Sequence, residues 1–171
     1  MIIWLTGRPC SGKTTLAIKV SKDLKIKNIR LDGDELRQNF WPELGYSVED
    51  REKNVKRIAT LAKDLVKIVD VVIIAAVAPI RSVRQRVFAE LAQDGAFIEV
   101  YVDAPYSVCL GRDVKGMYAK ALNGDIVDFT GVGSDYQPPL SPDVVCFTDD
   151  ETVEESAEKI IRAIHNKRSS R

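Results

Sequence analysis

The octapeptide Gly7-Arg8-Pro9-Cys10-Ser11-Gly12-Lys13-Thr14 follows an apolar run, Met1 to Leu5, and matches the pattern G-x-x-x-x-G-K-[ST]. Two glycines at this spacing let the backbone curl so that its N–H groups point inward, around the phosphates of a nucleotide. The lysine of this pattern reaches the β- and γ-phosphate oxygens, and the hydroxyl of the next residue ligates Mg²⁺. A helix, expected over residues 13–24, directs the positive end of its dipole at the same anion. We therefore predict a phosphate-binding loop that takes a nucleoside triphosphate with Mg²⁺.

Length and charge restrict the class of protein. The chain has 171 residues, with 25 Lys and Arg against 25 Asp and Glu, which suits a single domain over residues 1–171 with an α/β core. The balanced charge provides no basic field for nucleic acid or an anionic membrane. The longest apolar run, residues 71–79, is too short to span a bilayer, and the first residues are expected in a strand rather than a signal peptide. The cysteines Cys10, Cys109 and Cys146 form no CxxC pair and suit reduced thiols, so we expect a cytoplasmic protein.

Apolar runs of strand length alternate with amphipathic segments of helical length along the chain. Strands are expected at residues 2–6, 28–31, 71–77, 97–102 and 144–147. Helices are expected at residues 13–24, 34–39, 48–69, 82–94, 106–112 and 152–165. This alternation predicts a three-layer α/β fold, with a five-stranded parallel sheet and helices on both of its faces.

One segment interrupts the alternation. Residues 113–142 contain four glycines and three prolines and show neither periodicity. A long insertion of this kind in a compact domain is typically functional, often a cover over an active site, and we call it the lid segment. The alternative is a surface loop without a function.

Polar side chains follow the second expected strand, where ligands bind in parallel sheets. Asp32 and Asp34 stand at alternate positions, and Arg37 lies one helical turn beyond Asp34. Phosphoryl transfer requires Mg²⁺ ligands, cations for the equatorial oxygens and a carboxylate that receives a hydroxyl proton. The pair could supply the carboxylates, although Asp-Gly-Asp also forms a good turn and helix cap.

A regulatory GTPase is the competing class, because Asp113-Val114-Lys115-Gly116 matches D-x-x-G. The match follows an expected helix rather than a strand, and no N-K-x-D sequence occurs after it. These observations favour a kinase.

Five ordered blocks of the sequence resemble the adenylylsulfate (APS) kinases, a family of P-loop kinases. They are the phosphate loop, Leu31-Asp32-Gly33-Asp34 with Arg37, Leu44-Gly45-Tyr46-Ser47 with Glu49-Asp50-Arg51 and Asn54, Arg112-Asp113-Val114-Lys115-Gly116-Met117-Tyr118 with Lys120-Ala121, and Phe129-Thr130-Gly131. The resemblance implies a cytoplasmic enzyme of sulfate assimilation that uses ATP and Mg²⁺. It would phosphorylate the ribose 3′-hydroxyl of adenosine 5′-phosphosulfate to give 3′-phosphoadenosine 5′-phosphosulfate (PAPS). Its partner is thus a small molecule, and the oligomeric state stays open between a monomer and a homodimer.

The resemblance also implies residue roles. Lys13, Asp34 and Asp32 would be catalytic, with Asp34 orienting or deprotonating the hydroxyl and Thr14 and Asp32 serving Mg²⁺. ATP would be bound by Gly7, Arg8, Pro9, Cys10, Ser11, Gly12, Lys13, Thr14, Thr15, Arg112 and Lys115. The acceptor would be bound by Asp34, Arg37, Phe40, Arg51, Asn54, Pro79, Ile80, Lys115, Phe129, Thr130 and Gly131. For Phe129 the alternative is a buried anchor of the lid segment, and for Lys115 a solvated surface charge.

The chain departs from the family pattern after the third expected strand. Where the family commonly reads F-I-S-P-Y-R, this chain has Ala76-Val77-Ala78-Pro79-Ile80-Arg81, and Ala78 lacks the serine hydroxyl. An APS-kinase-like enzyme with a different nucleotide acceptor therefore stays a second hypothesis. A catalytically silent nucleotide-binding protein is disfavoured, since Lys13, Thr14, Asp32 and Asp34 are all present.

Overall fold

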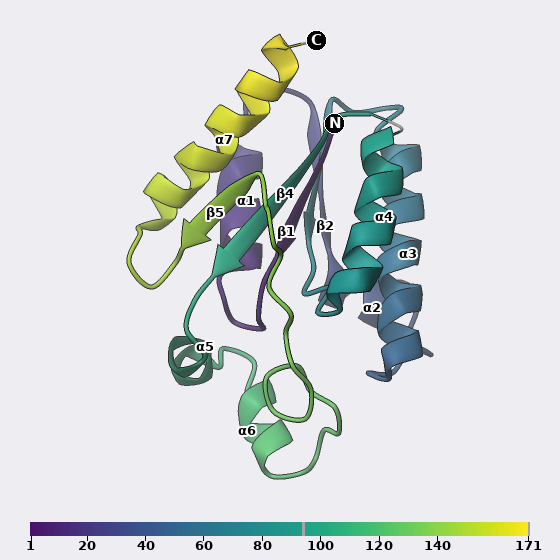
Figure 1. The fold of residues 1–171 in the computed structure, drawn as a ribbon, viewed down its shortest axis with the longest axis vertical. Helices are drawn as coiled ribbons and strands as arrows, with labels where there is room; N and C mark the ends of the chain where they lie inside the picture. The colour runs from purple at the N-terminus through teal and green to yellow at the C-terminus, as the bar shows by residue number, and fades with distance from the viewer. Residues whose placement is uncertain (94, 171) are drawn as a thin grey trace.

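The computed structural model describes residues 1–93 and 95–170, and its core is a parallel sheet. The strands are β1 (Ile2–Thr6), β2 (Asn28–Asp32), β3 (Val71–Ala75), β4 (Phe97–Asp103) and β5 (Val144–Phe147). Their order across the sheet is β2-β3-β1-β4-β5, and every neighbouring pair is parallel (Figure 1). The predicted five-stranded parallel sheet is confirmed. The phosphate loop follows its central strand.

Helices cover both faces of the sheet. α1 (Lys13–Asp23) and α7 (Val153–Ser169) lie on one face, and α3 (Val48–Leu65) and α4 (Arg81–Gln93) lie on the other (Figure 1). Successive side chains of a strand point to opposite faces, so Ile3 and Leu5 pack with α1 and α7 while Ile2 and Trp4 pack toward α3 and α4. The full burial of β1 explains its uninterrupted apolar sequence.

The carboxyl ends of the strands all face one end of the molecule. α2 (Gly33–Phe40) begins there directly after β2, and α5 (Tyr106–Arg112) and α6 (Met117–Leu122) lie beyond that edge (Figure 1). A small apolar cluster joins the lid segment to the end of β4, through Ala104, Cys109, Tyr118, Ala121 and Phe129. The lid segment is thus packed against the end of the sheet where ligands of parallel sheets bind.

The sequence did not predict α6. Its formation depends on Asp113, whose Oδ1 accepts a hydrogen bond from the Tyr118 N–H at 3.0 Å and whose Oδ2 accepts one from the Ala119 N–H at 3.0 Å. Gly116, which immediately precedes the helix, has φ 64°, a conformation that glycine adopts at no steric cost. A helix of six residues with glycine before it gives little periodic signal.

Several bounds differ from expectation. β3 ends at Ala75 instead of residue 77, since Ala75 pairs with Asp32, the last residue of β2. α3 ends at Leu65 instead of residue 69, because the chain turns there and Val69 packs onto the core. α7 extends to Ser169 rather than residue 165. The expected end of the fourth helix at Asp94 lies outside the described residues. Among the helices that are described, none is both long and apolar enough to cross a membrane.

Candidate functional site

A cavity of about 510 Å³ lies at the carboxyl edge of the sheet, between the phosphate loop, α2, α3 and the lid segment. Most of the predicted site residues line it: Pro9, Cys10, Gly12, Lys13, Thr14, Thr15, Asp32, Asp34, Arg37, Arg51, Asn54, Pro79, Arg112, Lys115, Phe129 and Thr130. Six predicted residues are not part of its lining: Gly7, Arg8, Ser11, Phe40, Ile80 and Gly131. Of these, Phe40 is 69% exposed at the end of α2, and Ile80 packs against the core.

The two glycines of the phosphate loop serve different steric needs. A Cβ on Gly7 would lie 2.3 Å from the backbone oxygen of Val102, so only glycine fits against β4. Gly12 has φ 101° and precedes α1, a conformation that a side chain disfavours. Cys10 adopts φ 60° between them although it has a side chain. These backbone conformations give the phosphate loop its curl.

Lys13 lies inside this curl. Its Nζ donates hydrogen bonds to the backbone oxygens of Gly7 at 3.0 Å and Arg8 at 2.6 Å, and the residue is 8% exposed. Burial lowers the pKa of Lys13 to about 8, against the opposing attraction of Asp34. The ammonium group is thus held by neutral carbonyls, which a phosphate anion would replace with a stronger, charge-assisted interaction.

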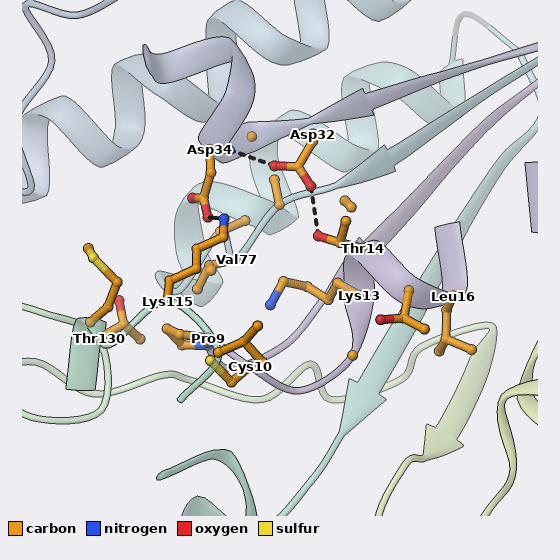
Figure 2. Close-up of a pocket in the computed structure, with 18 of the residues that line it drawn as sticks. Pro9, Cys10, Lys13, Thr14, Leu16, Asp32, Asp34, Val77, Lys115 and Thr130 are labelled. Atoms are coloured by element: carbon orange, nitrogen blue, oxygen red, sulfur yellow. Dashed lines mark hydrogen bonds and ion pairs between the residues drawn. The ribbon is translucent and has the colours of Figure 1, made fainter. Parts of the chain in front are cut away.

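Asp32 joins the phosphate loop to α2. Its Oδ2 accepts a hydrogen bond from the Thr14 hydroxyl at 2.7 Å, and its Oδ1 accepts one from the Asp34 N–H at 3.0 Å (Figure 2). Asp32 is the N-cap of α2, so the capping interpretation of the Asp-Gly-Asp sequence is correct without excluding a functional role.

Thr14 and Asp32 could supply two oxygen ligands to Mg²⁺ beside the phosphates of a nucleotide. The described residues contain no group of three or more His, Cys, Asp or Glu that could hold a metal ion. Mg²⁺ is usually bound by one or two protein ligands together with substrate phosphates and water. The adjacent oxygens of Thr14 and Asp32 satisfy that requirement at the mouth of the phosphate loop.

Asp34 and Lys115 form an ion pair across the cavity. Lys115 Nζ lies 2.7 Å from Asp34 Oδ2, and both side chains are 58% exposed (Figure 2). Lys115 comes from the turn between α5 and α6, so the lid segment contacts the carboxylate at the start of α2. The predicted lid cation and the predicted catalytic carboxylate are neighbours in space.

Arg37 and Arg51, the two cations expected to bind the acceptor, line the cavity and donate hydrogen bonds to neighbouring segments of the chain. Arg51 donates hydrogen bonds to Ser134 Oγ at 2.7 Å and to the backbone oxygen of Asp128, both in the lid segment. Arg37 donates to the backbone oxygen of Gly45, and its guanidinium lies 5.0 Å from the ring centroid of Tyr46. Asn54 is buried, and its Oδ1 has no hydrogen-bond partner among the described residues. A buried acceptor without a protein partner is unfavourable, so Asn54 Oδ1 is a candidate to accept a hydrogen bond from a ligand.

Contacts from the lid segment and its flanks reach the outer part of the phosphate loop. The Tyr118 hydroxyl donates to the Pro9 oxygen at 3.2 Å, and Arg112 Nη1 donates to the Cys10 oxygen at 3.3 Å. Tyr118 also meets Phe129 edge-on, with the ring centroids 5.0 Å apart. Phe129 is 5% exposed and lines the cavity, so it is both a buried anchor and a wall of the site.

A family model for adenylylsulphate kinase matches residues 1–147. The chain belongs to the adenylylsulfate kinase family. The adenylyl-sulfate kinase of Halothermothrix orenii is 45% identical over 168 residues, which cover 96% of this chain and 89% of that protein. A probable adenylyl-sulfate kinase of Pseudomonas aeruginosa is 42% identical, over 94% of this chain and 75% of that one. The solved APS kinase of Mycobacterium tuberculosis, in complex with AMPPNP and APS, is 34% identical with a TM-score of 0.87, over 96% of both chains.

Three contacts of this APS kinase chain were missed by the sequence analysis. Arg84 in α4 reaches the loop after β3, Tyr136 in the lid segment bonds to Thr6, and Thr148 donates from its hydroxyl to the Ser11 oxygen at 2.7 Å. The contacts of Tyr136 and Thr148 join segments more than 100 residues apart, and Arg84 bridges Ala78 to Gln137 in the lid segment. A motif or a periodicity gives no signal for such residues.

Proposed function

We propose that this protein transfers the γ-phosphoryl group of ATP to the ribose 3′-hydroxyl of adenosine 5′-phosphosulfate, giving ADP and PAPS. The observation that carries the proposal is the convergence of Lys13, Thr14, Asp32 and Asp34 in one cavity, with Lys115 opposite. Phosphoryl transfer needs these groups together: cations for the phosphates, oxygen ligands for a metal and a carboxylate for the hydroxyl. A relative solved with an ATP analogue and APS bound supports the choice of substrates.

In the donor half, the phosphate loop would cradle the ATP phosphates with its backbone N–H groups. Lys13 would exchange the Gly7 and Arg8 oxygens for phosphate oxygens. Thr14 and Asp32 would hold Mg²⁺, which neutralises charge on the β- and γ-phosphates when bound. Arg112 would flank the adenine of ATP.

In the acceptor half, Asp34 would orient the 3′-hydroxyl and receive its proton. Arg37 and Arg51 would bind the phosphosulfate, because guanidinium groups form paired hydrogen bonds with such anions. Phe129 would stack on the adenine, an interaction worth about 1–3 kcal/mol per base. Phe40, Pro79, Ile80, Thr130 and Gly131 stay predicted members of this half, and of these only Pro79 and Thr130 line the cavity.

The ion pair between Lys115 and Asp34 would have to separate during the reaction. While Lys115 Nζ donates to Asp34 Oδ2 at 2.7 Å, that oxygen is not available to accept a hydrogen bond from the substrate hydroxyl. Lys115 would move to the phosphates of ATP, freeing Asp34 and adding positive charge where negative charge develops. The same motion would draw the lid segment over the site and exclude water.

A coupled ADP-release assay with Mg²⁺·ATP tests the proposal, with APS compared against AMP, ADP and CDP as acceptors. We expect APS to be preferred by orders of magnitude and its product to carry the new phosphate at the 3′-hydroxyl. Asp34→Asn should lower kcat far more than it weakens APS binding. Glu35→Gln is the matched control, because this neighbouring carboxylate is exposed and is not part of the cavity lining. Efficient phosphorylation of another nucleotide and not of APS would refute the proposed substrate.

We also propose that the enzyme is a cytoplasmic homodimer. All three cysteines are free thiols, which suits a reducing compartment. Large apolar side chains, including Phe40 and Val48, are exposed beside the acceptor half, and a second copy of the chain could cover them. Sedimentation velocity at micromolar concentration tests the dimer, and a single monomeric species would contradict it.

A further inference from the structure

The segment that joins β3 to α4 forms a wall of the cavity whose backbone is held from behind. Val77, Ala78 and Pro79 line the cavity. The Val77 oxygen accepts a hydrogen bond from the Thr6 hydroxyl at 2.7 Å, and the Pro79 oxygen accepts one from the Gln137 N–H at 3.0 Å. The Ala78 oxygen accepts one from Arg84 Nη1 at 2.6 Å. With its carbonyls occupied by the protein, this wall, defined as residues 77–79, offers apolar side chains to a ligand.

Ala78 has an unusual backbone conformation. Its φ is 44°, in the left-handed region, which glycine adopts freely and other residues adopt rarely. Ala78 is also buried, at 5% exposure. An unfavourable conformation persists where the surroundings impose it, and such positions cluster at ligand sites.

Arg84 supplies that constraint. The side chain is 1% exposed, and besides Ala78 it donates from Nη2 to the Gln137 oxygen at 2.5 Å. Its Nε lies 3.5 Å from Glu99 Oε1, and its guanidinium lies 5.3 Å from the ring centroid of Tyr136. A buried guanidinium is unfavourable unless it is paired and hydrogen-bonded. These partners fix it behind the wall.

The wall belongs to the acceptor half of the cavity. Ala78 and Pro79 lie beside Arg51 and Val55, with which they also border a small crevice behind the wall. Arg84 itself does not line the cavity, so any effect it has on a ligand must pass through the wall.

We propose that Arg84 is a positioning residue of the acceptor site, which holds Ala78 in its left-handed conformation and thereby sets the surface against which the acceptor nucleotide lies. The inference rests on the proposed function, since it assigns this wall to APS rather than to ATP. Without the Arg84 hydrogen bond, Ala78 relaxes toward negative φ and only a fraction of molecules carries a wall of the right shape. The apparent dissociation constant for the acceptor then equals its intrinsic value divided by that fraction, so the acceptor binds more weakly.

The test is Arg84→Lys, which keeps the positive charge beside Glu99 but loses the paired guanidinium donors. We expect the KM for APS to rise about tenfold, as it does when the competent conformer falls to about one tenth of molecules. The kcat and the KM for ATP should stay within about twofold of wild type. Arg86→Lys is the matched control, since Arg86 lies on the same helix, is 61% exposed and pairs with Glu52 at the surface. If Arg84→Lys raised the KM for APS and the KM for ATP equally, or left the KM for APS unchanged, the proposal would be overturned.

A second substitution separates positioning from general destabilisation. Ala78→Gly removes the conformational penalty at φ 44°. In the Arg84→Lys background, Ala78→Gly should restore the KM for APS to within about twofold of wild type. If Arg84→Lys acted only by loosening the fold, the added flexibility of glycine would raise the KM further instead. No restoration would refute the mechanism. If Arg84→Lys does not fold, Arg84→Met, which keeps an unbranched side chain but has no donor for the Ala78 oxygen, is measured in the same way.

The wild-type protein keeps the two proposals distinguishable. A wild type that does not phosphorylate APS refutes the proposed function, and the assignment of the wall to APS with it. Normal wild-type turnover of APS with no selective effect of Arg84→Lys refutes only the role of Arg84.

Discussion

Nucleotide binding should weaken as the pH rises through about 8, because Lys13 is then uncharged in the free protein. Burial lowers the pKa of Lys13 from 10.5 to about 8. In the complex, the phosphates of ATP replace two carbonyl groups as partners of its Nζ, and an anion restores a high pKa. Binding at alkaline pH therefore requires Lys13 to take up a proton.

The magnitude follows from the protonated fraction. With a pKa of about 8, Lys13 is charged in about nine tenths of molecules at pH 7 and in about one tenth at pH 9. Because the apparent dissociation constant varies inversely with the competent fraction, it should rise about tenfold between these two pH values. Binding at pH 9 should also take up about 0.9 proton per nucleotide, from the same fraction. The nucleotide contributes little, since a phosphate group has its second pKa at about 6.

Isothermal titration calorimetry with a non-hydrolysable ATP analogue and saturating Mg²⁺ measures both quantities, in buffers of different ionisation enthalpy. Lys13→Arg is the control, because a guanidinium keeps its charge throughout this range. Its affinity, even if lower, should not vary between pH 7 and pH 9. A wild-type affinity independent of pH over the same interval, with no proton uptake, would show that Lys13 is charged in the free protein and would refute the reasoning.

Three further substitutions test other contacts of the site. Thr14→Val keeps the shape of the side chain but removes the hydroxyl that donates to Asp32 at 2.7 Å. The Mg²⁺ concentration that gives half-maximal rate should rise about 10- to 100-fold. An unchanged Mg²⁺ titration would contradict a role of Thr14 in metal binding. Lys115→Met breaks an exposed ion pair with Asp34, so the free energy of unfolding should change by less than about 1 kcal/mol. The kcat should fall about 100-fold. A wild-type kcat in this variant would show that Lys115 is a surface charge without a catalytic role. Tyr118→Phe removes the hydroxyl that donates to the Pro9 oxygen, and urea denaturation should show a loss of about 1 kcal/mol, whereas a fully stable variant would show that this contact between lid segment and phosphate loop does not contribute.

The elements and residues that depend on local sequence were predictable. The phosphate loop is a contiguous motif, and the strand sequences are apolar because the sheet is covered on both faces. Asp32 and Asp34 could be placed at the edge of the sheet because Asp32 ends β2 and Asp34 lies two residues later, at the start of α2. The resemblance to a family added Lys115 and Phe129, which lie in a segment without periodicity and are found beside the cavity.

Features that depend on the tertiary fold, or on side-chain contacts that follow no sequence pattern, were not predictable. An arginine in an amphipathic helix is normally expected at the protein surface. The guanidinium of Arg84 is instead buried and donates to the backbone oxygens of residues 78 and 137. The left-handed backbone of Ala78 has no local signal, since alanine disfavours it. Helix α6 depends on the side chain of Asp113 and on the burial of Tyr118, which outweigh its short length.

The last helix lies beyond the portion of the chain that the family model matches, yet it completes the enzyme. α7 buries Ala157, Ile160 and Ile164 against the same core as α1, and residues 151–153 and 156, before and within its first turn, line the cavity. The cavity proposed to bind ATP therefore extends beyond the residues that the family model matches. The helix that completes the core thus also supplies part of the cavity lining, so the packing of α7 and the shape of the cavity are coupled.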